Sequence, residues 1–174
     1  MLLSIGMVGC ESSTDAASEV PRIVSGVPDP CALLPQDALE GIVEASVTES
    51  KVGDTKAGVV RASCFYRYED AGIGLLTIED AVAWQRRYAA ERSSYETRGL
   101  RLPDDQPVSG LGDDAVLDVR HNELNVRSGD FVLRAAHGRR LGSGSGALTP
   151  AEGAASRDLQ KNMIREALSR LPRG

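Results

Sequence analysis

Few side chains in this sequence could carry chemistry. Its two histidines, His121 and His137, each stand near the end of a predicted strand, and no cysteine or carboxylate pair completes a zinc ligand set at local spacing. The run 142–146 places a glycine where a hydrolase nucleophile elbow needs its serine, and no phosphate-loop lysine follows it. We therefore expect no catalytic motif, no metal site and no cofactor.

Two pairs of neighbouring aspartates offer the oxygen ligands that calcium prefers. Asp113 and Asp114 lie beside Gly110 and Gly112, and a second pair occupies positions 104 and 105. Calcium takes about six or more oxygen ligands, and neither spacing matches an EF-hand loop. Aspartates that hydrogen-bond their own backbone in a turn explain both pairs without an ion.

Cys10 is predicted to be an anchor. It follows the apolar stretch MLLSIGMVG and precedes the polar residues ESSTD, and Val8-Gly9-Cys10 resembles the lipobox of a bacterial lipoprotein signal peptide. Lipid on Cys10 would hold the protein on the extracytoplasmic face of the cell membrane. The alternative is an ordinary disordered N-terminus with a chance cysteine.

Cys31 and Cys64 form an even pair once Cys10 is set aside for lipid. Export places them in an oxidising compartment, where paired cysteines form disulfides. We predict a Cys31–Cys64 disulfide, and the alternative is two buried free thiols.

Composition indicates one globular domain behind a tether. Hydrophobic residues make up 41% and charged residues 26% of the 174 residues, as in ordinary soluble domains. We assign residues 1–9 to a signal-peptide remnant, 10–28 to the lipidated cysteine and a disordered polar tether, and 29–174 to a single domain. The net charge is −5, aromatic residues are sparse at 4%, and the basic residues form no dense stripe, so we expect no nucleic-acid partner.

Periodicity and turn signals predict an α+β fold. A short first helix is expected over 33–39, and extended runs over 45–52, 59–68 and 73–78. Asp80 is a plausible N-cap for a helix that ends at Gly99. Three further strands follow over 115–120, 124–126 and 131–136, the last two joined by Ser128-Gly129-Asp130. The capping box Thr149-Pro150-Ala151-Glu152 starts the last helix. These elements predict an antiparallel sheet with two or three packed helices, in the rough order α-β-β-β-α-β-β-β-α.

The helix expected after Asp80 carries two surface hypotheses. Trp84, Tyr88 and Tyr95 recur at helical spacing, and such a stripe usually packs in the core, although it can instead line a ligand groove where helix meets sheet. A possible contact surface for an anionic envelope polymer or an acidic partner consists of the segment's arginines, Arg86, Arg87, Arg92, Arg98 and Arg101. The alternative is a solvated helix face.

Three short motifs resemble those of one lipoprotein family. Asp29-Pro30-Cys31-Ala32-Leu33-Leu34-Pro35 looks like the start of the domain in the actinobacterial lipoprotein family catalogued as domain of unknown function 3558. Cys64-Phe65-Tyr66 stands where that family has its second cysteine, and Gly110-Leu111-Gly112-Asp113 resembles its turn into a hairpin. The resemblance implies an envelope address and an α+β domain, and it brings no agreed enzymatic activity. A related expectation is a sandwich similar to those of Mog-like and photosystem P-subunit-like proteins.

Together these features predict a membrane-tethered extracytoplasmic lipoprotein that acts as a non-catalytic binding or accessory module of the cell envelope. Its partner would be an envelope protein, a cell-wall polymer or a small ligand. Two alternatives stay open: an extracytoplasmic enzyme whose active site only the fold assembles, and a sensor-like ligand-binding domain. A deep pocket with convergent polar groups would favour the enzyme, and an exposed apolar patch or unpaired sheet edge would favour binding.

Overall fold

The computed structural model describes residues 23–24, 26–53, 61–69, 72–100, 105–119, 121–139 and 149–172. Within these ranges the fold is α+β, as predicted, with a seven-stranded antiparallel sheet, a two-stranded hairpin and four helices. The hairpin consists of β1 (Ile23–Val24) and β2 (Val27–Pro28). The sheet strands are β3 (Val47–Val52), β4 (Arg61–Tyr68), β5 (Gly72–Asp80), β6 (Asp105–Pro107), β7 (Asp114–Asp118), β8 (Glu123–Ser128) and β9 (Phe131–Arg139). The helices are α1 (Pro30–Leu33), α2 (Gln36–Val43), α3 (Ala81–Thr97) and α4 (Pro150–Arg170).

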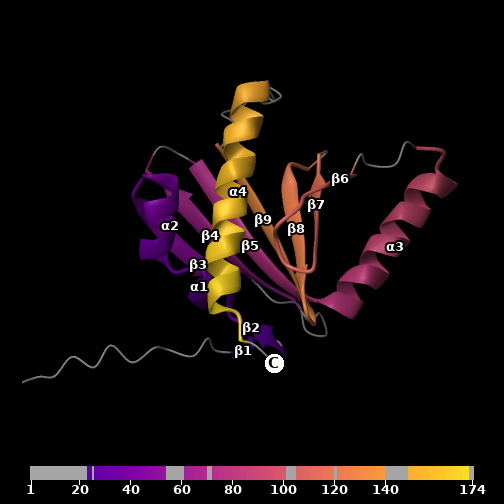
Figure 1. The fold of residues 1–174 in the computed structure, drawn as a ribbon, viewed down its shortest axis with the longest axis horizontal. Helices are drawn as coiled ribbons and strands as arrows, with labels where there is room; N and C mark the ends of the chain where they lie inside the picture. Colours follow the sequence, from indigo (N-terminus) through magenta and orange to yellow (C-terminus); the bar gives the residue numbers. More distant parts are fainter. Residues whose placement is uncertain are drawn as a thin grey trace, which may run out of the picture.

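The order of strands across the sheet is β3-β4-β5-β9-β8-β7-β6. Strand β4 pairs with β5, β7 pairs with β8, and β8 pairs with β9, each time antiparallel and between strands consecutive in the sequence. The long-range pairing is β5 with β9, which runs from Gly72↔Arg139 to Asp80↔Phe131. This pairing joins the two halves of the chain in the middle of the sheet (Figure 1).

One face of the sheet carries the core. The long helix α4 crosses this face, with α1 and α2 beside it (Figure 1). Alternate residues of β4 and β5, such as Tyr66 and Leu76, point at these helices and are almost completely buried. Met163 and Ile164 of α4 meet them from the other side and are also fully buried. Each large apolar side chain buried in this way contributes about 1.5–3 kcal/mol.

Two local features differ from the predicted elements. The single helix expected over 33–39 is two short helices, because Pro35 takes an extended conformation and is the N-cap of α2 rather than part of its first turn. Residues 105–107, expected in a proline-containing loop, form the edge strand β6 against β7. The first deviation is local, since a proline disfavours helical backbone at the residue before it, and Leu34 is not helical. The second reflects pairing with β7, which overrides a weak local preference.

The folded unit also begins before Asp29. Val27 and Pro28, assigned from sequence to the tether, form β2, and the Val27 side chain is completely buried in the core. No helix in the described ranges is long and apolar enough to span a bilayer.

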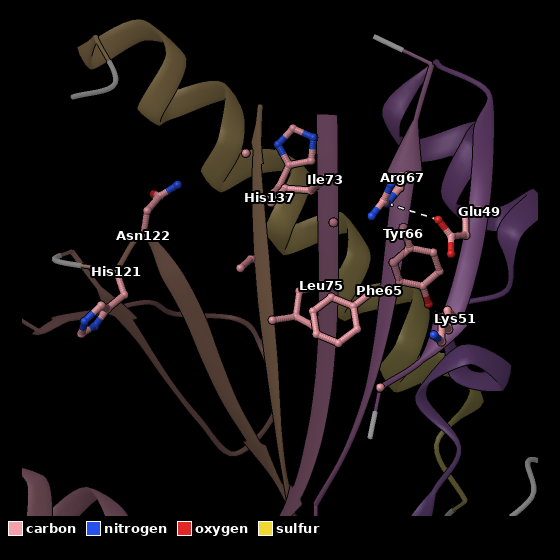
Figure 2. A pocket seen from close by; sticks show the side chains of 14 residues that line it. Glu49, Lys51, Phe65, Tyr66, Arg67, Ile73, Leu75, His121, Asn122 and His137 are labelled. Carbon is pink, nitrogen blue, oxygen red and sulfur yellow. Dashed lines mark ion pairs between the residues drawn. The ribbon is translucent and has the colours of Figure 1, made fainter. Parts of the chain in front are cut away.

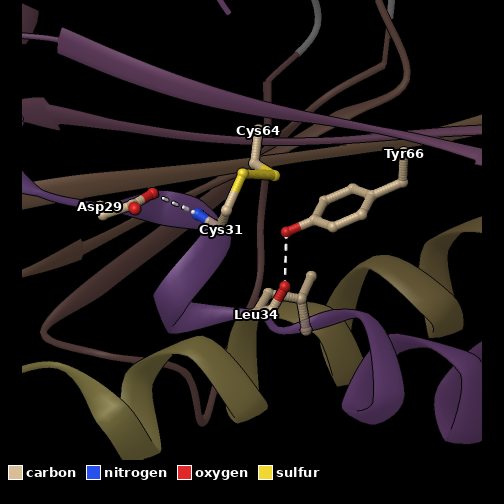
Figure 3. Close-up of a disulfide and its surroundings, with 5 residues drawn as sticks. All are labelled: Asp29, Cys31, Leu34, Cys64 and Tyr66. Atoms are coloured by element: carbon tan, nitrogen blue, oxygen red, sulfur yellow. Dashed lines mark hydrogen bonds between the residues drawn. A yellow bond between two sulfur atoms is a disulfide. The ribbon is translucent and has the colours of Figure 1, made fainter. Parts of the chain in front are cut away.

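The start of the domain is fastened to β4 by a covalent bond and a buried hydrogen bond. A disulfide joins Cys31 of α1 to Cys64 of β4, with the two Cα atoms 5.2 Å apart (Figure 3), so the predicted cross-link is confirmed. Asp29 caps α1 by accepting a 2.8 Å hydrogen bond from the Cys31 backbone N–H. Tyr66, two residues beyond Cys64, donates to the Leu34 carbonyl oxygen (Figure 3).

Helix α4 holds the turn between β7 and β8. Asn122, in this turn, has a left-handed backbone with φ of 50°. Gln160 of α4 donates a 2.6 Å hydrogen bond from Nε2 to the Asn122 carbonyl oxygen, and Asn122 donates from Nδ2 to the Ser156 hydroxyl. Ser156 in turn donates to the His137 carbonyl oxygen on β9. This network holds the backbone next to His121, which lies at the edge of the sheet face opposite α4.

Candidate ligand-binding site

The face of the sheet opposite α4 is only partly covered, and we call it the open face. Its side chains alternate with the core residues along each strand. The strand register places Lys51, Phe65, Leu75, Ala136 and Glu123 next to one another in a row that crosses β3, β4, β5, β9 and β8. The open face therefore has an apolar centre between charged margins.

A pocket of about 590 Å³ lies on this apolar centre, and we call it the Phe65 pocket. Phe65 and Ile73 are large and remain 51% and 47% exposed, although both lie on interior strands, β4 and β5. The neighbouring positions on β9, Ala136 and Gly138, carry almost no side chain, which leaves a hollow beside them. Leu75 lies next to Phe65 on the pocket floor (Figure 2).

Charged side chains stand around this apolar floor. Arg67 pairs with Glu49 across β3 and β4 at 3.2 Å, and Lys51 lies beside Phe65 (Figure 2). On the far side, His121 forms a 2.7 Å contact from Nδ1 to the Asp118 carboxylate. An apolar floor with a polar rim is typical of small-molecule sites in both composition and size.

Helix α3 leaves the sheet at the end of β5 and stands over the other part of the open face. Asp80 ends β5 and caps the helix by accepting a 2.8 Å hydrogen bond from the Ala83 backbone N–H, as predicted. Ala81 is the helix's buried residue. The helix therefore does not pack into the core, and a cleft of about 250 Å³ separates it from β7, β8 and β9.

The aromatic stripe of α3 lines this cleft, which we call the α3 cleft. Trp84, Tyr88 and Tyr95 are half-buried, so the interpretation that they belong to the core is wrong. The structure instead brings all three together in a groove between helix and sheet, the second arrangement considered from the sequence. Trp84 and Tyr88 are stacked, with ring centroids 4.8 Å apart and planes at 11°.

Ion pairs attach α3 to the open face. Arg87 donates to both carboxylate oxygens of Glu79, at 2.9 and 3.3 Å, and the Glu79 side chain is only 5% exposed. On the adjacent strands, Arg134 pairs with Glu123 at 3.4 Å. Burial lowers the pKa of the Arg134 guanidinium, since desolvation disfavours its charge more than the neighbouring carboxylates favour it. Of these two ion pairs, Arg87–Glu79 attaches α3 to the sheet, and Arg134–Glu123 joins β9 to β8 beneath it.

Strand β6 adds a second polar attachment near the helix's middle. The Tyr88 hydroxyl donates to the Asp105 carboxylate, and Arg92 contacts the same carboxylate at 3.3 Å. The Arg92 guanidinium also lies over the Tyr88 ring at 5.6 Å. Burial, followed by the nearby Asp118 carboxylate, raises the pKa of Asp105. Position 105, interpreted from sequence as part of a turn, is thus in strand β6 and helps to hold α3.

The predicted arginine surface is divided by the fold. Arg87 and Arg92 turn toward the cleft and make ion pairs there, whereas Arg86 and Arg98 are exposed. Arg101 and the predicted lipidation site Cys10 lie outside the described residues. The four described arginines therefore do not share one free basic face.

Asp113 and His137, which were considered from the sequence as possible ion ligands, make contacts within the fold. Asp113 accepts a 2.7 Å hydrogen bond from the Gly129 backbone N–H, so this aspartate caps the β8–β9 turn. His137 is on the core side of β9, next to the Tyr68 ring. Among the residues that the structure describes, no group of three or more histidine, cysteine or carboxylate side chains is arranged to hold a metal ion.

Sequence reasoning missed Phe65, Ile73 and Leu75 as site residues. A signal was present in β5, which carries apolar side chains at alternate and intervening positions, where a half-solvated strand alternates apolar with polar. In β4, Phe65 is the one apolar residue among the polar positions Arg61, Ser63 and Arg67. Comparison with known proteins finds no match to this chain among family models, curated proteins or solved structures. The function is therefore inferred from the geometry alone.

Proposed function

We propose that this protein is a non-catalytic binding module of the cell envelope that holds a small apolar or amphiphilic molecule on its open face. One observation carries the proposal: Phe65 and Ile73, on the interior strands β4 and β5 of the seven-stranded sheet, stay about half exposed over a hollow. Exposed apolar side chains gathered in a concave site are characteristic of binding surfaces. A ligand that covers them gains the free energy of their burial.

The polar groups at the pocket rim favour binding over catalysis. His121 is paired with Asp118, as a general base would be, but within the described ranges its imidazole has no hydrogen bond to a hydroxyl or thiol. A histidine–carboxylate pair without a nucleophile in reach lacks the group that covalent catalysis requires. Of the other charged residues that line the pocket, Glu49 and Arg67 are paired with each other.

The proposed address is the outer face of the membrane, with Cys10 carrying lipid as the resemblance to lipoproteins implies. The Cys31–Cys64 disulfide supports an oxidising compartment, since such bonds are rare in the cytosol. Lipid on Cys10 and the segment before β1 would keep the open face near the bilayer, where apolar and amphiphilic molecules are concentrated.

The binding function is tested with N-phenyl-1-naphthylamine, an uncharged apolar dye whose fluorescence rises on leaving water. We expect saturable binding by the full chain. Phe65→Ser should weaken binding about tenfold, equivalent to ~1.4 kcal/mol, because it removes apolar contact area. Val82→Ser is the matched control, since Val82 is 53% exposed on α3 and lines neither the Phe65 pocket nor the α3 cleft.

A second variant fills the pocket instead of removing its floor. A Cβ built on Gly138 meets no atom within 4 Å, so Gly138→Leu should fold normally and occupy the hollow. We expect it to block the dye. Equal binding by the parent, Phe65→Ser and Gly138→Leu proteins, or no saturable binding by the parent protein, would contradict the proposal.

A further inference from the structure

The Phe65 pocket and the α3 cleft adjoin each other. His121 lines both, and Ala136 of the pocket pairs with Glu123 of the cleft on the adjacent strand. The cross-strand row continues from Leu75 to Ala136 in the pocket, and then to Glu123 and Asp118 in the cleft. One elongated molecule lying along this row would place one end over Phe65 and the other beneath α3.

The two ends of this path have opposite chemistry. The floor at Phe65, Ile73 and Leu75 is apolar, whereas the cleft is lined by arginine, carboxylate, amide and tyrosine groups. A molecule that satisfies both ends has an apolar chain and a polar head. The chain belongs over Phe65, since burial of a charged or hydroxylated head there would leave its polar atoms without partners.

The charge balance of the cleft indicates what kind of head it accepts. Arg87 is paired with Glu79 and more loosely with Glu91, and Arg134 is paired with Glu123. Arg92 is paired with Asp105, and His121 lies against Asp118. An anionic or cationic head would have to compete with an existing partner in each pair. Hydroxyl groups can accept from guanidinium N–H groups and donate to carboxylate oxygens without breaking these pairs. Paired charges therefore favour an uncharged head rich in hydroxyls.

The aromatic wall adds a flat apolar surface to this polar lining. Trp84 and Tyr88 line the cleft with Tyr95. The rings of Trp84 and Tyr88 are stacked on each other, and the Arg92 guanidinium lies over the Tyr88 ring, so the aromatic plane offered to a ligand is the face of Trp84 turned away from Tyr88. A pyranose ring has one face of C–H groups, which packs against an aromatic plane, and an equator of hydroxyls, which hydrogen-bond outward. The arrangement of aromatic wall and paired charges matches these two requirements of a sugar ring.

We propose that the site binds a single-chain amphiphile with an uncharged, hydroxyl-rich head, of the kind a glycoside presents. The apolar chain lies in the Phe65 pocket and the head lies in the α3 cleft, beside Trp84 and Glu123. This inference rests on the proposed function of the Phe65 pocket and specifies the class of its ligand.

The test compares three probes with the same chain and different heads by calorimetric titration of the full chain. The probes are decyl β-glucoside, decyl sulfate and decyltrimethylammonium, each kept below its critical micelle concentration. We expect the glucoside to bind at least about fivefold more tightly than either charged probe. Gly138→Leu should weaken binding of all three probes, because it fills the space of the shared chain.

Trp84→Leu removes the aromatic wall and keeps an apolar, helix-compatible side chain. It should reduce the preference for the glucoside to within about twofold, with little change in decyl sulfate affinity. Val82→Leu, on the same helix outside the cleft, should keep the parent preference.

The outcomes separate the two proposals. Equal affinity for all three heads, or tighter binding of a charged head, overturns the proposed head while leaving the apolar pocket in place. Glucoside binding that Gly138→Leu does not weaken overturns the placement of chain and head in one continuous site. Failure of all three probes to bind overturns the proposed function and this inference together.

Discussion

The Tyr66 hydroxyl donates a 2.6 Å hydrogen bond to the Leu34 carbonyl oxygen, across a sequence separation of 32 residues. Both residues are fully buried or nearly so, and burial raises the pKa of the Tyr66 hydroxyl far above its usual value. The bond holds the junction between α1 and α2 against β4, two residues from the disulfide (Figure 3). The hydrogen bond and the disulfide thus hold β4 in place from the core side. On the opposite side of the strand, Phe65 and Arg67 point into the candidate site.

Tyr66→Phe should destabilise the fold by about 1–3 kcal/mol, because the Leu34 carbonyl would stay buried without its donor. Urea denaturation measures this change. Thr48→Val is the control, since the Thr48 hydroxyl also donates to a carbonyl oxygen in the sheet but is exposed to solvent. Its cost should stay within about 0.5 kcal/mol. Equal losses of stability from the two substitutions would show that the buried hydrogen bond contributes no more than the exposed one.

Removing the disulfide by the double substitution Cys31→Ser, Cys64→Ser should cost about 3–4 kcal/mol, because a closed loop of this length restricts the unfolded chain. The denaturation midpoint of the parent protein should fall on addition of reductant, and that of the double variant should not. Two reactive thiols besides Cys10 in the denatured, unreduced protein would contradict the bond.

Arg87→Met should destabilise the protein by about 1.5–3 kcal/mol, since it leaves the Glu79 carboxylate buried without its charged donor. Adding Glu79→Gln should restore part of this loss, because the uncompensated charge is then gone. The matched control is Arg86→Met, the exposed neighbour on α3, which should change stability by less than about 0.5 kcal/mol. A double variant that is no more stable than Arg87→Met alone would argue against a buried ion pair.

The Asp105 carboxyl should increase the free energy of unfolding as the pH falls. Its pKa is raised in the folded protein, so the folded state binds more protons than the unfolded state between the ordinary aspartate pKa, about 3.9, and the raised value. Stability from this group therefore increases as pH falls through that window and is lost as pH rises. Relative to Asp105→Asn, the parent protein should gain stability from pH 7 toward about pH 4.

Asp158→Asn is the control for this pH series, because Asp158 is 73% exposed and pairs with Lys161 on the surface of α4. Relative to Asp158→Asn, the parent protein should show no comparable gain in stability as the pH falls. A difference between parent and Asp105→Asn that does not vary with pH would contradict the raised pKa.

Lipid attachment at Cys10 should be visible when the full reading frame is expressed in a host that processes lipoproteins. The protein should enter the detergent phase on partitioning, and its N-terminal peptide should carry acyl mass. Cys10→Ser should move the protein to the aqueous phase. An unmodified Cys10 peptide from the parent protein would rule out the anchor.

The sequence alone determined the features that depend on near neighbours. The capping box at Thr149 starts α4, the Ser128-Gly129-Asp130 turn joins β8 to β9, and Asp80 caps α3, all as predicted. Such features follow from backbone conformation and hydrogen bonds within a few residues, so local composition specifies them. The disulfide was also predictable, because the count of cysteines left one pair.

The site depended on contacts that no local pattern contains. Pairing of β5 with β9 placed Leu75 beside Ala136 and so created the hollow at Phe65. The direction of α3 decided whether Trp84 and Tyr88 faced the core or a cleft. The ion pair between Glu79 and Arg87 holds α3 over the open face. Strand order and helix direction minimise the free energy of the whole core, to which residues distant in sequence contribute together. Only the tertiary structure, therefore, could convert ordinary strand and helix residues into one binding surface.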